Sequence, residues 1–147
     1  MKPARVLAVF RHPTPYRDGL LDRVAALPDI DLEVLYLGRA FAQTPWSAGA
    51  LEHRHRFPRG FLTRQVSGHD IAIHPGAIAR LVTRRPDVAV LSGWSDPTVL
   101  TLALLCRILR IPYVLVVESF ARTSRFWILD FGFKRAAVKR ALFLTAA

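Results

Sequence analysis

The chain has 147 residues, of which 52% are hydrophobic, and a formal net charge of +10. This length suits one domain with a sizeable core, and the apolar content excludes an intrinsically disordered chain. The longest apolar runs are far shorter than the ~20 residues that a membrane-spanning helix needs. The sole cysteine, Cys106, falls in a helical pattern. We expect it to be a small core residue, with neither a disulfide nor a cysteine zinc site.

Arginine accounts for 18 of the 21 basic residues. The arginines are scattered and no helix-turn-helix or RNA-binding signature accompanies them, so we expect no nucleic-acid partner. Residues 122–143 mix basic side chains with aromatic ones such as Trp127 and Phe131. This composition favours peripheral contact with an anionic membrane, although it also suits an amphipathic helix packed on the domain. Met1-Lys2-Pro3 leads directly into a strand pattern. We therefore expect no signal peptide and a cytoplasmic protein, which can lie at the inner face of the membrane.

The first half of the chain alternates strand and helix patterns. Residues 5–10 form a short apolar run typical of a strand buried on both faces, and two prolines in 11–17 predict an extended loop after it. Apolar residues at helical spacing predict a helix over 20–27, and 31–37 is expected to be a second strand. In 51–57 apolar and charged residues alternate, which predicts an edge strand with His53 and His55 on its apolar side.

The second half continues this alternation after a loop that we expect over 60–68. The segment His74-Pro75-Gly76 introduces a helix, which ends before Pro86 because proline cannot continue it. The remaining elements that we expect are a strand over 87–91, a helix over 98–109, a strand over 113–117 and a helix over about 127–144.

Strands and helices in this alternation predict an α/β fold with a doubly wound, Rossmann-like parallel sheet. The expected strand order is 3-2-1-4-5, which places strand one (5–10) beside strand four (87–91). An antiparallel pairing among the four strands over 5–10, 31–37, 87–91 and 113–117 would contradict this prediction.

Several common sites are missing from the sequence. Gly19 is the only glycine near the first loop, so neither a dinucleotide fingerprint nor a P-loop is present. His53 and His55 share one side of a strand, but no carboxylate or cysteine cluster completes a metal site, so we expect no metal. Asp96 precedes Pro97 and is expected to cap a helix.

Polar side chains gather where the strands end. His12 and Arg17 follow strand one, Ser92 and Trp94 follow strand four, and Glu118 follows strand five. Because strands one and four are expected to be neighbours at the switch point of the sheet, these groups should converge on one crevice. Glu118 comes directly after an apolar strand, where partial burial disfavours its charge, and His12 or Arg17 could offset that cost.

The same residues carry a resemblance to a known family. The segment His12-Pro13-Thr14-Pro15-Tyr16-Arg17 resembles the loop after the first strand of bacterial family 4 glycosyltransferases. Further similar motifs follow in the same order, namely Arg85-Pro86-Asp87-Val88, Ser92-Gly93-Trp94, Arg110-Ile111-Pro112-Tyr113 and Glu118-Ser119. The resemblance spans nearly the whole chain and implies the amino-terminal, acceptor-side domain of a GT-B enzyme, which is one half of that architecture.

This resemblance implies the acceptor-binding half of a sugar-nucleotide-dependent, retaining glycosyltransferase in polysaccharide or glycoconjugate biosynthesis. The implied donor is a nucleoside-diphosphate sugar, the acceptor is a sugar or glycolipid, and neither a cofactor nor a metal is bound. The expected site residues are Glu118 and His12 as catalytic groups and Tyr16, Arg17, Ser92, Gly93, Trp94 and Ser119 as substrate-binding groups. Two features depart from the family: Glu118 stands where many relatives have a histidine, and the glycine-rich first loop is missing.

We expect residues 1–147 to stop before a carboxy-terminal donor-binding domain and to be inactive alone. Two alternatives remain. The chain is a membrane-associated binding subunit of a split glycosyltransferase, or it is a non-catalytic, flavodoxin-like binding domain.

Overall fold

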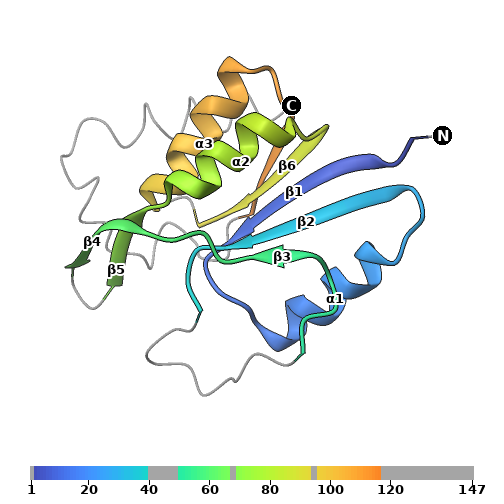
Figure 1. Cartoon of the computed structure of the whole chain (residues 1–147), viewed down its shortest axis with the longest axis horizontal. Helices are drawn as coiled ribbons and strands as arrows, with labels where there is room; N and C mark the ends of the chain where they lie inside the picture. The colour runs from blue at the N-terminus through green and yellow to red at the C-terminus, as the bar shows by residue number, and fades with distance from the viewer. Residues whose placement is uncertain (1, 40–49, 67–68, 94–95, 117–147) are drawn as a thin grey trace.

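The computed structural model describes residues 2–39, 50–66, 69–93 and 96–116, and its main feature is a parallel sheet (Figure 1). The sheet contains, in spatial order, β3 (His55–Arg56), β2 (Ile30–Tyr36), β1 (Ala4–Phe10), β6 (Val88–Ser92) and β7 (Tyr113–Val116). Each neighbouring pair in it is parallel. The α/β, Rossmann-like fold class is therefore confirmed, and these five strands stand in the expected order 3-2-1-4-5 when they are counted along the chain.

Two further strands lie outside this sheet. β4 (Phe61–Val66) and β5 (His69–Ile73) pair antiparallel as a separate hairpin. The prediction of a loop over 60–68 was therefore wrong. The expected edge strand is present but short, because only His55 and Arg56 of 51–57 pair with β2. The alternation of sides along 51–57 is confirmed, since His53 is buried and Arg54 is exposed.

Helices cover both faces of the sheet (Figure 1). α1 (Pro15–Ala25) lies on one face, and α2 (Pro75–Arg84) and α3 (Pro97–Ile108) lie together on the other. Each helix has proline in its first turn, where the fixed φ of proline fits and its missing N–H costs nothing. This explains why α1 begins at Pro15, five residues before the start of the helix expected over 20–27.

The core follows from the alternation of side chains along buried strands. On one face Leu7 of β1 packs with Leu81 of α2 and Leu102 of α3, all fully buried. On the other face Phe10 of β1 packs in the same cluster as Leu21 of α1. Both faces of β1 are therefore apolar, as is typical of a central parallel strand.

Cys106 is fully buried in α3, as predicted. Burial raises the pKa of its thiol to about 11, so the thiol is protonated at neutral pH and does not act as a nucleophile. The helix expected over 127–144 lies outside the described residues. Among the described helices, none has the length and apolar character needed to cross a bilayer.

Candidate functional site at the ends of β1 and β6

The order in which the chain adds strands to the sheet reverses between β1 and β6. From β1 the chain passes through α1 to β2 on one side, and from β6 it passes through α3 to β7 on the other. Val9 of β1 lies opposite Leu91 of β6, so the two strands end side by side. In open α/β sheets the crevice at this switch point is where ligands bind. The topology thus places the candidate site at the loops that follow β1 and β6.

The loop after β1 carries three of the predicted site residues. His12 is half-buried, whereas the Tyr16 side chain in the first turn of α1 is 72% exposed. The Arg17 guanidinium lies 4.5 Å from the centre of the Phe10 ring and donates to the Tyr16 hydroxyl at 3.2 Å. Tyr16 and Arg17 are therefore in contact just after β1, and His12 lies in the same segment of the chain.

The start of α1 also contains polar atoms whose hydrogen bonds are incomplete. The carbonyl of Thr14 accepts from the backbone N–H groups of Arg17 and Asp18 at 3.0 and 2.8 Å. Thr14 Oγ1 and Asp18 Oδ2, however, are buried and have no hydrogen-bond partner among the described residues. Buried polar groups without protein partners usually bind a water or a ligand group.

The loop after β6 brings Ser92 and Gly93 to the same end of the sheet. Ser92 is buried, and Gly93 has a φ of 92°, which side chains with a Cβ rarely adopt. No described atom lies within 4 Å of the place that a Cβ on Gly93 would occupy, so the backbone is open there. Trp94, Glu118 and Ser119 lie outside the described residues, and so does the expected pairing of Glu118 with His12 or Arg17.

We expect Gly93→Ala to lower the free energy of unfolding by about 1–2 kcal/mol, because an L-residue is strained at this φ. The surroundings leave room for a methyl group, so the loss should come from the backbone alone. Urea unfolding measures it, and Gly19→Ala is the matched control. Gly19 lies inside α1 with open space around it, so alanine there should be neutral or stabilising. Equal destabilisation by both changes would contradict this explanation.

Asp96 has the structural role that its position predicts. Its Oδ1 accepts from the backbone N–H of Thr98 at 2.8 Å and so caps α3. Thr98 in turn donates to the carbonyl of Ala72 at 3.0 Å and contacts the His74 ring at 3.1 Å. These bonds attach the start of α3 to β5 and to His74, which follows β5. They thereby hold the carboxyl end of the loop that follows β6.

One buried polar network was missed in the sequence. Tyr36, at the end of β2, donates to Asp18 Oδ1 at 2.6 Å, and its oxygen lies 3.0 Å from His53 Nε2. His53 Nδ1 contacts Asp22 Oδ1, which also accepts from the His53 backbone N–H at 2.9 Å. A phenol has one hydrogen, so when Tyr36 donates to Asp18 its oxygen can only accept from His53. We call Asp18, Tyr36, His53 and Asp22 the Tyr36 network.

The Tyr36 network explains why His53 and His55 face the same side. Both rings pack against Tyr36, at centroid distances of 6.0 and 6.4 Å. The ring nitrogens of His53 contact the Asp22 carboxylate and the Tyr36 hydroxyl. No group of three His, Cys, Asp or Glu side chains that could hold a metal ion occurs within the described ranges. A signal for the network was present in the sequence, because Asp18 and Asp22 are four residues apart and share one face of a helix.

Comparison with known proteins adds no family to this description. No protein-family profile matches the chain, and no curated protein matches it significantly.

Proposed function

We propose that the chain is the acceptor-side domain of a sugar-nucleotide-dependent glycosyltransferase with GT-B architecture, acting in polysaccharide or glycoconjugate biosynthesis. The observation that carries this proposal is the position of the motif 12–17, which follows β1 at the switch point, where β1 pairs with the strand that ends at Ser92 and is followed by Gly93. The sequence resemblance supports the same assignment, since its motifs 12–17 and 92–94 come at the ends of β1 and β6, which are neighbours in the sheet.

The chemistry of these loops suits an acceptor rich in hydroxyl groups. Thr14 Oγ1 and Asp18 Oδ2 can accept hydrogen bonds, and Arg17 and His12 can donate them. Gly93 leaves the end of β6 open, so that a ring could approach the backbone closely. We assign acceptor positioning to Tyr16, Arg17, Ser92 and Gly93, and acid–base or orienting work to His12 together with Glu118.

The donor requires a different environment. The loop between β1 and α1 has no glycine-rich turn to surround a diphosphate. We therefore propose that the nucleoside-diphosphate sugar is bound mainly by a second, donor-binding domain of the complete enzyme. Such a division would place the two reactants on facing domains, where closure brings them to reacting distance.

A binding experiment tests this assignment. The chain is titrated with methyl glycosides, detergent-solubilised glycolipids and nucleoside-diphosphate sugars, and binding is followed by ligand-observed NMR. We expect a glycoside or glycolipid to bind and His12→Ala to weaken it by about tenfold, which corresponds to one lost hydrogen bond to a charged or polar group. Arg23→Ala, which removes an exposed charge at the far end of α1, should leave binding unchanged. Binding of sugar nucleotides that His12→Ala weakens, with no binding of any glycoside or glycolipid, would refute the acceptor-side assignment.

A further inference from the structure

A groove lies between the β3 edge of the sheet and α2. Its volume is about 600 Å³, which suits a small organic molecule. Leu35 of β2 lines it together with Phe57 and Pro58, which follow β3, and with Ala79 and Thr83 of α2. The groove thus offers apolar surface from three separate segments.

Apart from Thr83, the polar side chains of the described lining are basic. Arg39, Arg56 and Arg80 line the groove with His55, and none of the described lining residues is a carboxylate. The Arg39 guanidinium lies 4.9 Å from the centre of the Phe57 ring. A guanidinium stacked on an aromatic ring keeps its N–H groups free at its edges, where they can bind an anion.

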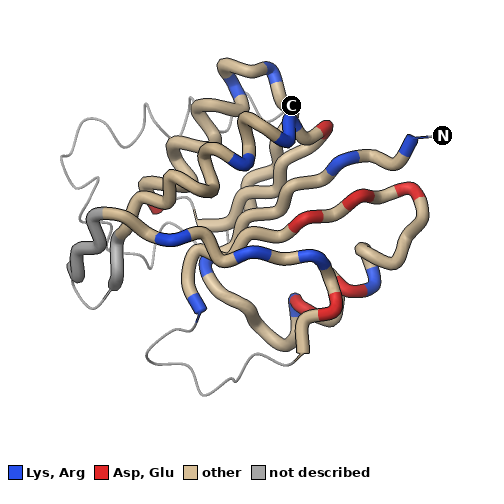
Figure 2. The backbone as a smooth tube through the Cα atoms, in the orientation of Figure 1, with Lys and Arg blue, Asp and Glu red and all other residues tan. Residues whose placement is uncertain are grey.

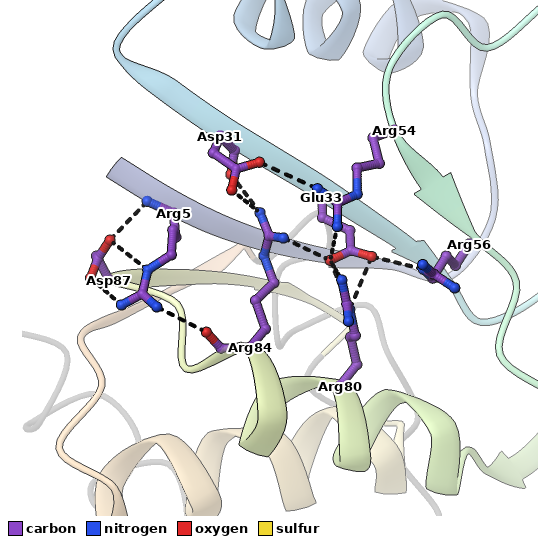
Figure 3. Close-up of polar contacts among 8 residues, drawn as sticks. All are labelled: Arg5, Asp31, Glu33, Arg54, Arg56, Arg80, Arg84 and Asp87. Carbon is purple, nitrogen blue, oxygen red and sulfur yellow. Dashed lines mark hydrogen bonds and ion pairs between the residues drawn. The ribbon is translucent and has the colours of Figure 1, made fainter. Parts of the chain in front are cut away.

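Two of these arginines belong to an ion-pair cluster around a buried carboxylate (Figure 3). Its centre is Glu33, whose side chain is fully buried. Arg56 Nε donates to Glu33 Oε1 at 2.9 Å, and Arg80 binds both carboxylate oxygens, with its Nε at 3.0 and 2.8 Å. Arg84 and Arg54 also contact Glu33, at 3.2 and 3.8 Å. We call these residues and Asp31 the Glu33 cluster.

The Glu33 cluster has more positive than negative charge. Asp31 contacts Arg84 at 2.9 Å and Arg54 at 3.6 Å, so two carboxylates face four arginines. Figure 2 shows the same pattern along the chain, with acidic positions in β2 beside basic positions around β3. Two positive charges of the cluster are therefore left over, and Arg39 adds a third at the groove. Clustered cations without enough carboxylates favour the binding of a multivalent anion.

We propose that this groove binds the phosphate or diphosphate group of a small phosphorylated compound. Arg39 and the N–H groups of Arg56 that Glu33 does not use would hold the anion, because guanidinium groups match phosphate oxygens in pairs. The Phe57 ring and Leu35 would contact the organic part of the ligand. The proposal rests on the groove and the Glu33 cluster, and it holds whether or not the chain serves a glycosyltransferase.

Calorimetric titration of the whole chain with pyrophosphate and with glucose 1-phosphate tests the proposal. A parallel arm measures co-sedimentation with phosphatidylcholine vesicles that do or do not contain phosphatidylglycerol. If the natural ligand is a soluble phosphorylated compound, we expect binding in the calorimetric titration. If the phosphate belongs to a lipid headgroup, we expect binding only to the vesicles that contain phosphatidylglycerol. In either arm Arg39→Ala should weaken binding by about tenfold, since a charge-assisted contact is lost.

Arg23→Ala is the matched control, because Arg23 is an exposed arginine on α1, on the opposite face of the sheet. It removes the same charge and should leave the affinity unchanged. Arg39 is exposed as well, so both variants should melt at the wild-type temperature. Equal weakening by the two variants would show attraction to the overall charge of the chain, and it would overturn the proposal. Failure of all the probes to bind would overturn it too.

Discussion

Replacing Glu33 by glutamine is expected to lower the free energy of unfolding by about 3–5 kcal/mol, the usual effect of removing one partner of a buried ion pair. Glutamine has nearly the same shape, but it leaves Arg80 without a carboxylate among its described contacts. The side chain of Arg84, which is only 7% exposed, keeps Asp31 as its carboxylate partner within the described ranges. Urea unfolding at neutral pH measures the loss.

Asp87→Asn is the control for this change. Asp87 also binds an arginine, with Arg5 Nη2 at 2.9 Å, but half of its side chain is exposed to solvent. Water can replace the lost partner there, so the unfolding midpoint should move much less than in Glu33→Gln. If both variants lose the same stability, the burial of Glu33 is not what makes its charge important.

The Glu33 cluster also predicts how stability changes in acid. Burial by itself raises the pKa of Glu33, but hydrogen bonds from Arg80 and Arg56 outweigh it and hold the pKa below the ordinary value of 4.5. Ionised Glu33 therefore favours the folded chain, and its contribution is complete above pH 4.5. The contribution is lost as the pH falls below 4.5 towards the lower pKa of the folded state. Glu33→Gln should lack this part of the acid-induced loss.

The sheet could be predicted because its strands are buried on both faces. Such strands appear in the sequence as short apolar runs, and 87–91 is an example that matches β6 within one residue. The hairpin of β4 and β5 was missed because its residues include polar ones such as Arg64, Gln65 and Asp70, so no apolar run marks it. The Ser67-Gly68 dipeptide between the two segments is a turn signal that could have indicated it.

The candidate site was predictable only in part. The strand ends locate His12, Arg17, Ser92 and Gly93 together, because parallel strands end at one edge. The Glu33 cluster could not be found in the same way. Its members Glu33 and Arg80 are 47 residues apart, and nothing in the local sequence shows that α2 crosses over β2.

Tyr36→Phe is expected to lower the free energy of unfolding by about 1–3 kcal/mol, although the ring and its packing remain. The hydroxyl is the link between Asp18 Oδ1 at 2.6 Å and His53 Nε2 at 3.0 Å, and both partners are buried. Without it, each keeps a polar atom that water cannot reach easily. Chemical unfolding of the variant at neutral pH gives the loss.

His53→Ala and the double variant complete a mutant cycle with Tyr36→Phe. Because Tyr36 and His53 are in contact, their effects should not add, and the coupling energy should be about 0.5–3 kcal/mol. Tyr113→Phe is the control. Tyr113 is also a buried tyrosine of the sheet, but it lies in β7, away from the Tyr36 network. The effect of Tyr113→Phe should add to that of His53→Ala. If the effects of Tyr36→Phe and His53→Ala also add strictly, the Tyr36 network does not act as a unit.

The Tyr36 network also makes a prediction for alkaline solution. Burial raises the pKa of Tyr36 well above its ordinary value of 10, and the hydrogen bond to Asp18 raises it further. The neutral phenol is therefore favoured in the folded chain, whereas the unfolded chain ionises near pH 10. This contribution is complete below pH 10 and is lost as the pH rises above it, because the unfolded state then releases a proton that the folded state retains. In Tyr36→Phe the group is gone, so the stability of the variant should fall less steeply above pH 10 than that of the wild type. Parallel slopes for the two proteins would mean that Tyr36 does not lie in the buried, carboxylate-bound position that the structure assigns to it.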